Sequence, residues 1–118
     1  MNIRSMRPSR VVAATLAVGA LAFAAGAGAA DEAAARGLAR QSNCFKCHAI
    51  DKKKDGPAWK DVAAKMKGTK DAEAKLYTHL TTGPKVKFED GHEEDHPIIK
   101  AKSPDDTKNL VGWILTLQ

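Results

Sequence analysis

Five consecutive residues carry the clearest chemical signal in this chain: Cys44-Phe45-Lys46-Cys47-His48. In this C-x-x-C-H pattern, two thiols three positions apart can each form a thioether with one vinyl group of a haem, and the adjacent imidazole can bind the iron. Covalent attachment suits a chain too short to enclose a large cofactor by packing alone. The pattern therefore predicts one covalently bound haem c, attached at Cys44 and Cys47, with His48 as the proximal iron ligand.

Two other kinds of site fit the same cysteines. His92 and His96 stand four positions apart and complete a C-x2-C…H-x3-H formula, which is a zinc-binding pattern. More than forty residues separate the two pairs, whereas a zinc finger has about 12–15. A thiol–disulfide redox centre is the second alternative, and it is typical of a βαβ context. No segment after residue 30 has the pattern of a strand, so haem is the favoured reading of the motif.

The first thirty residues differ in composition from the rest. Residues 1–10 contain three arginines and no acid, residues 11–30 are an almost unbroken apolar run, and the run closes in small residues. A basic start, an apolar centre and a small-residue exit predict a signal peptide over residues 1–30, cleaved before Asp31, and thus a periplasmic protein without stable membrane insertion. The alternative is an uncleaved anchor, because twenty apolar residues are just long enough to span a bilayer.

Cleavage would change the charge of the protein. The formal net charge of +5 includes the three arginines of residues 1–10, so residues 31–118 carry +2. Two haem propionates would bring the total close to zero. The basic balance of the whole chain therefore gives no indication of nucleic-acid binding.

Apolar spacing predicts four helices after Asp31 and no strand, in a single all-α domain over residues 31–118. The fourth helix has the clearest start, with Ser103 as N-cap, a proline at the first helical position and two aspartates in the first turn. Between the third and fourth helices lies a long polar loop, residues 84–102, whose length calls for a functional reason. The predicted helices are residues 32–41, residues 57–66, a third capped by Thr69 and ended by Gly83-Pro84, and a fourth that runs from Ser103 to Leu117.

These features resemble the small bacterial class I cytochromes c. Residues 56–59 are similar to the family's Gly-Pro segment beside the proximal histidine, and residues 110–115 are similar to its aromatic-bearing last helix. The resemblance implies a cytochrome c-like fold of about four helices around one covalently bound haem. It also implies that Pro57, Trp59 and Trp113 pack near that haem.

The resemblance further implies that the last helix crosses the first, with Gly37 and Leu38 against Trp113. A glycine inside a helix costs about 1 kcal/mol relative to alanine. A close crossing gives a reason to keep Gly37, and simple tolerance is the alternative. His79, on the third helix, is assigned either to a haem propionate or to a surface or packing role.

The chain departs from that family at the sixth iron ligand. The family usually supplies a Met next to a Pro from the loop before the last helix, and that loop here contains no Met. His96-Pro97 stands at about the corresponding position, so the resemblance implies His96 as the distal ligand and His/His coordination. The alternatives are His92, Met66 on the apolar face of the second helix, or an iron without a sixth ligand from the protein.

A filled His/His coordination sphere predicts electron transfer and no enzymatic activity. A thioether ligand raises the reduction potential of a haem, and a second imidazole in its place does not. The expected function is therefore a monomeric one-electron carrier of relatively low reduction potential. It would dock transiently with larger redox proteins, and lysines 52–54 and the acidic residues of 89–95 are candidates for complementary charge. A merely solvated face is the alternative for both clusters. The alternative function is a haem protein that binds or reduces O2, NO or peroxide at a labile sixth site.

Overall fold

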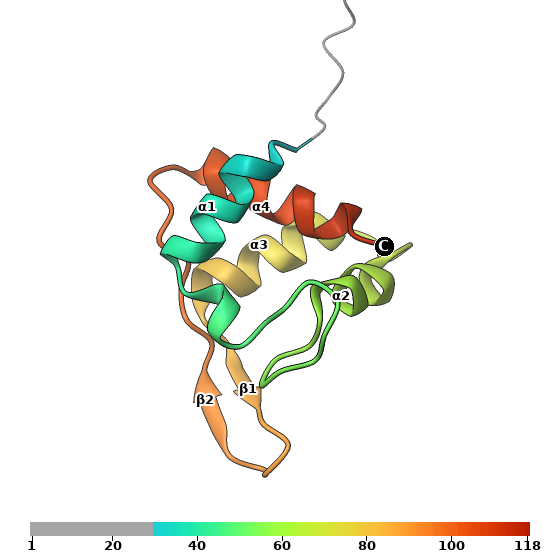
Figure 1. The fold of residues 1–118 in the computed structure, drawn as a ribbon, viewed down its shortest axis with the longest axis vertical. Helices are drawn as coiled ribbons and strands as arrows, with labels where there is room; N and C mark the ends of the chain where they lie inside the picture. Colours follow the sequence, from blue (N-terminus) through green and yellow to red (C-terminus); the bar gives the residue numbers. More distant parts are fainter. Residues whose placement is uncertain (1–29) are drawn as a thin grey trace, which may run out of the picture.

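The computed structural model describes residues 30–118, which form a helical body and one projecting hairpin (Figure 1). The predicted signal peptide falls on residues that lie, except for Ala30, outside this described part. Within residues 30–118 no helix is both long and apolar enough to cross a membrane. The elements are α1 (Glu32–Gln41), a 3-10 turn (Cys44–Lys46), α2 (Trp59–Met66), α3 (Ala72–Thr82), β1 (Lys85–Lys87), β2 (Glu93–Asp95) and α4 (Pro104–Thr116).

Side-chain caps fix the starts of the first and last helices. The Asp31 carboxylate accepts a hydrogen bond from the Ala34 amide at 3.0 Å, and the Ser103 hydroxyl accepts one from the Asp106 amide at 3.3 Å. Asn109 of α4 also pairs with the backbone of Asp31 in both directions, at 2.7 and 2.9 Å. The start of α1 is therefore held against α4, and the predicted start of the last helix is confirmed.

The crossing of α1 and α4 forms the centre of the hydrophobic core. Trp113 is 4% exposed, and its ring meets that of Trp59 edge-on, with centroids 5.8 Å apart. Full burial of a side chain such as Leu110 contributes about 1.5–3 kcal/mol, so this crossing holds the body together. The core cluster consists of Ala35, Leu38, Ala39, Trp59, Leu110, Trp113 and Ile114.

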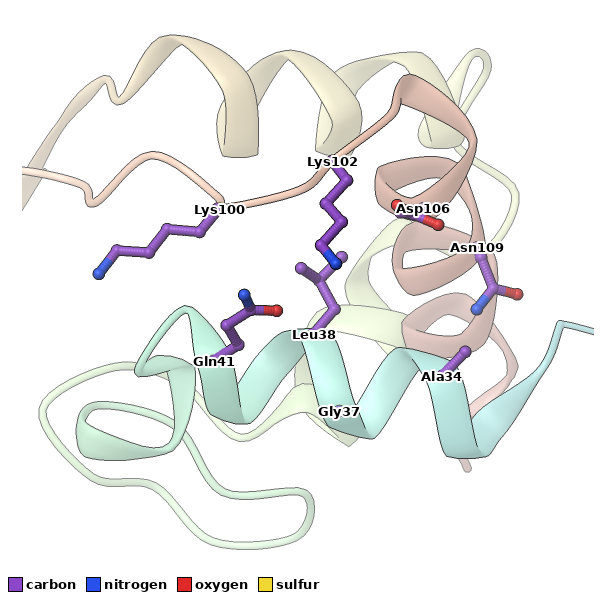
Figure 2. Close-up of a pocket in the computed structure, with 8 residues that line it drawn as sticks. All are labelled: Ala34, Gly37, Leu38, Gln41, Lys100, Lys102, Asp106 and Asn109. Carbon is purple, nitrogen blue, oxygen red and sulfur yellow. The ribbon is translucent and has the colours of Figure 1, made fainter.

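Gly37 does not take part in the crossing, so the expectation that it would contact Trp113 was wrong. Leu38 does pack there, and the Arg36 guanidinium lies over the Trp113 ring, 5.0 Å from its centroid. A Cβ atom at Gly37 would meet nothing within 4 Å. Gly37 borders a hollow of about 220 Å³. Figure 2 shows the other residues that line it, among them Lys100, Lys102 and, on α4, Asn109. Simple tolerance is the better explanation of this glycine.

Two predicted helix starts differ from the structure. The second helix begins at Trp59, two residues later than expected. The third begins at Ala72 and not after Thr69, because Asp71 adopts a left-handed conformation with φ of 60° and no side-chain cap. A residue with positive φ interrupts a helix, so the capping pattern at Thr69 was misleading.

The expectation of no strand was also wrong. Within residues 84–102, β1 and β2 pair in an antiparallel hairpin that projects from the helical body (Figure 1). The register places Lys85 opposite Asp95 and Lys87 opposite Glu93. The Lys85 ammonium lies 3.0 Å from the Asp95 carboxylate. Opposite charges on facing residues stabilise such a pair, although neither strand has the composition of a typical strand.

Candidate functional site

A largely apolar cavity of about 690 Å³ lies among α2, α3, α4, the C-x-x-C-H turn and the chain that follows β2. This volume is within the range of cofactor sites, which is about 300–1,000 Å³. Cys44, Cys47 and His48 lie on its wall, together with His79 and His96. The structure thus brings both thiols and three of the four histidines to one hollow.

The 3-10 turn presents the two thiols and the first imidazole together. The amides of Cys47 and His48 both donate to the Cys44 carbonyl, at 3.3 and 3.0 Å, after Asn43 has turned the chain with φ of 58°. This tight turn brings three chemically active side chains, spaced over five residues, to one wall. Burial raises the pKa of the Cys44 thiol, and the neighbouring Cys47 adds to the rise, whereas a backbone hydrogen bond opposes it.

His48 is held in one orientation by the segment that follows it. Its Nδ1 donates to the Pro57 carbonyl at 2.7 Å, which leaves Nε2 as the free lone pair. A Cβ atom on Gly56 would lie only 2.5 Å from the His48 ring, so this glycine provides space for the imidazole. Burial lowers the pKa of His48, the charges of His96 and Lys54 lower it further, and the Pro57 hydrogen bond opposes them. The ring is therefore in the neutral form that binds metal.

The aromatic residues predicted to pack near the haem are divided between the cavity and the core. Trp59 lines the cavity beside Pro57, and its ring centroid is 5.8 Å from that of His48. Trp113 lies behind Trp59 in the core and does not line the cavity in the part of the chain that the structure describes. The Phe45 ring also lies next to that of Trp59, with centroids 5.2 Å apart.

His96 reaches the cavity from the segment after β2. Its ring centroid is 6.2 Å from that of His48, and its Nδ1 donates to the Pro97 carbonyl at 2.9 Å. The His96 amide donates to the Pro84 carbonyl at 2.9 Å, which anchors this segment to the end of α3. Gly83 makes that close approach possible, because its φ is 60° and a Cβ there would lie 2.6 Å from the His96 carbonyl oxygen.

The other predicted ligands have different surroundings. His92 is exposed at the hairpin turn, where it stacks on Phe88 with centroids 4.3 Å apart and contacts the carboxylates of Asp90 and Glu94. Those hydrogen bonds raise its pKa above the usual value. Within residues 30–118 it does not line the cavity, whereas Met66 of α2 does.

One histidine stands closer to the site than the sequence indicated. His79, on α3, lines the cavity with its ring centroid 4.4 Å from that of His96. Burial lowers its pKa, and the charges of His96 and His48 add to the effect. Its place beside Leu76 and Leu80 on the apolar stripe of α3 was the only signal in the sequence.

Comparison with known proteins identifies the family. Residues 32–118 match the family model described as Cytochrome c. The chain belongs to the cytochrome c family. It is 38% identical over 82 residues to cytochrome c-551 of Pseudomonas aeruginosa, which covers 67% of this chain and 72% of that one. It is also 37% identical over 81 residues to cytochrome c-552 of Nitrosomonas europaea, covering 69% and 76% respectively.

Solved structures agree with this membership. The class 1 cytochrome MtoD from Sideroxydans lithotrophicus ES-1 has 60% sequence identity and a TM-score of 0.72, covering 75% of this chain and 98% of that one. The Nitrosomonas europaea cytochrome c552 structure has 35% identity and a TM-score of 0.59, covering 70% and 99%. The predicted family and fold are therefore confirmed.

Membership in the cytochrome c family also decides the cofactor and the general role. This cytochrome is a small class I c-type cytochrome that carries one covalently bound haem c with its iron. That cofactor replaces the zinc and thiol–disulfide alternatives. The related cytochromes c-551 and c-552 indicate a small haem electron carrier.

Proposed function

We propose that this cytochrome is a periplasmic one-electron carrier whose haem is attached to Cys44 and Cys47 and whose iron is bound by His48 and His96. The observation that carries the His/His assignment is the distance of 6.2 Å between the two ring centroids. Two imidazoles on opposite sides of one metal ion, each with a nitrogen about 2.0 Å from it, have ring centres about 6 Å apart.

The second ring nitrogens support the same assignment. Each Nδ1 is hydrogen-bonded to a backbone carbonyl, that of Pro57 for His48 and that of Pro97 for His96. Histidines that bind metal are usually held in this way by the other ring nitrogen, which fixes both the tautomer and the ring orientation. The donor set consists of two thiols and two oriented imidazoles in a largely apolar cavity. This set fits a covalently attached haem.

The residues around the cavity suit electron transfer. When bound, the haem supplies an iron that gains and loses one electron. The chain holds the surroundings of the iron constant: the Pro57 carbonyl fixes the orientation of His48, and the segment anchored to the end of α3 fixes that of His96. Because a second imidazole stands in place of a thioether, we expect a lower potential than in Met-ligated relatives. A filled coordination sphere also leaves no open position for O2, NO or peroxide.

The proposed partners are larger redox proteins that dock transiently with this cytochrome. Lys53 contacts Glu89 of the hairpin, and Lys54 donates to the Phe45 carbonyl at 2.6 Å. Residues 85–95 hold five carboxylates against two lysines, whereas residues 51–55 hold three lysines against two aspartates, so the hairpin has the larger formal excess of charge. We expect the acidic hairpin to meet a basic surface beside the electron-donating or electron-accepting group of the partner, with an association rate that falls as ionic strength rises.

Export to the periplasm is proposed from the basic and apolar composition of residues 1–30. The start of the fold supports the boundary, because Asp31 is the N-cap of α1 and is tied to Asn109. The intact mass of protein recovered from periplasmic extract tests it. A chain that begins at Asp31 is expected, and a chain that retains residues 1–30 would contradict the proposal.

Attachment at the two cysteines is tested with serine variants. The wild-type chain is expected to keep one haem in denaturing solvent, at the mass of chain plus haem, and to resist thiol alkylation. Cys44→Ser and Cys47→Ser should each keep a single thioether, and the double variant should lose all covalently bound haem. A double variant that still carries covalent haem would contradict the assignment, and so would a wild-type chain with two alkylatable thiols.

A further inference from the structure

The proposed His/His iron leaves one cavity histidine without a role. His79 faces the cavity from α3, with its ring centroid 4.4 Å from that of His96 and the two planes inclined at 57°. The two imidazoles come from different elements, one from a helix and one from the segment after the hairpin. The chain therefore presents a second imidazole in the cavity beside the one assigned to the iron.

The two elements are tied together where these histidines lie. The Ile99 amide donates to the Leu80 carbonyl at 2.9 Å, and the His96 amide donates to the Pro84 carbonyl at 2.9 Å. One bond is made by His96 itself and the other by a residue three positions later, so together they hold this segment along the end of α3. His79 is consequently kept next to His96 by backbone geometry and does not depend on the side chains of the hairpin.

The two histidines differ in how they are held. His96 belongs to a segment outside the helices, whereas His79 belongs to the 11-residue helix α3. A change between staggered side-chain conformers moves an imidazole by a distance comparable with that between the two rings.

We propose that His79 is a reserve axial ligand, which binds the iron on the distal side when His96 leaves it. The proposal deepens the proposed function and rests on its His/His assignment. Its consequence is that movement of the segment that carries His96 would exchange one imidazole for another without opening the coordination sphere. The iron would then stay six-coordinate and closed to small ligands even while the segment moves.

The test compares distal variants of the intact haem-loaded protein at neutral pH, without added imidazole. His96→Ala is expected to keep a low-spin ferric spectrum and to bind CO poorly in the ferrous form, because His79 replaces the lost ligand. His79→Ala/His96→Ala should lose the low-spin spectrum and bind CO readily. The matched control, His92→Ala/His96→Ala, removes a second histidine outside the cavity and should behave like His96→Ala.

Two outcomes would overturn the proposal. A high-spin, CO-binding His96→Ala protein would show that His79 does not reach the iron, and a low-spin double His79/His96 variant would show that another group does. Far-UV circular dichroism checks that each variant is folded. If His96→Ala does not fold, His79→Ala alone is informative: it should bind CO measurably, unlike the wild type, because nothing then replaces His96 when it leaves the iron. A His79→Ala protein as indifferent to CO as the wild type would refute the proposal.

The wild-type spectrum separates this proposal from the one on which it rests. A low-spin wild type with a high-spin His96→Ala variant leaves the carrier with His/His ligation intact and removes only the reserve ligand. A high-spin wild type would remove the His/His assignment itself, and the reserve role with it.

Discussion

Replacement of Gly56 by alanine tests how closely the chain fits the proximal imidazole. A Cβ atom there would lie 2.5 Å from Cε1, 2.9 Å from Nδ1 and 3.0 Å from Nε2 of His48. Carbon atoms in favourable contact are about 3.5–4.0 Å apart, so the ring must retreat by roughly 1 Å. That movement would stretch the 2.7 Å hydrogen bond from Nδ1 to the Pro57 carbonyl.

The magnitude follows from two contributions. Overpacking of this kind costs about 1–3 kcal/mol, and loss of the hydrogen bond costs about 0.5–1.5 kcal/mol. We expect Gly56→Ala to lower the free energy of unfolding by about 1.5–4.5 kcal/mol, and the melting temperature by roughly 6–36 °C. The midpoint of thermal unfolding, followed by circular dichroism of the haem-loaded protein, measures this loss.

Gly37→Ala is the matched control. Nothing lies within 4 Å of its new methyl group, and Gly37 is an exposed residue inside α1. Alanine should therefore stabilise the protein by about 0.5–1 kcal/mol. If Gly56→Ala unfolds at the wild-type temperature, or if both variants change stability alike, the steric reasoning at His48 is refuted.

Three further predictions concern the distal segment, the last helix and the hairpin. Gly83→Ala should displace the His96 carbonyl, destabilise the protein by about 1–3 kcal/mol and increase CO binding to the ferrous protein; unchanged CO binding would contradict this. Ser103→Ala should cost about 1 kcal/mol in chemical denaturation, and no loss would mean that the cap contributes nothing. The contacts of protonated His92 with Asp90 and Glu94 raise its pKa above the unfolded-state value of 6.5. They therefore stabilise the hairpin fully below pH 6.5, and this contribution is lost as the pH rises through the raised pKa. An NMR titration should show that value fall in Asp90→Asn, and an unchanged value would refute the contact.

Much of the helical body could be predicted because its signals are local. The C-x-x-C-H spacing favours covalent haem over zinc or thiol–disulfide chemistry, and Ser103 followed by a proline predicts where α4 begins. The apolar stripe of α4 likewise indicated its buried face, including Leu110 and Trp113. Each of these features depends on residues within one or two helical turns.

What could not be predicted depends on backbone conformation and packing that the residue types alone do not specify. The hairpin is a register between Lys85–Lys87 and Glu93–Asp95, in which charges pair across strands whose composition does not favour strand formation. The start of α3 depends on a left-handed Asp71 that no residue preference requires. The approach of His79 to His96 arises because the segment that carries His96 packs along α3. The spacing of apolar residues in the sequence cannot reveal such a contact.

The most direct test of the central claim is the absorption spectrum of the purified protein, ferric and then reduced, with and without CO. His/His ligation predicts a low-spin spectrum in both oxidation states, without the weak long-wavelength band of a thioether bound to ferric iron, and indifferent to CO. A thioether band would contradict the ligand assignment in favour of Met66. A high-spin ferric form or ready CO binding would contradict the carrier with a closed iron and support a haem protein that binds small molecules.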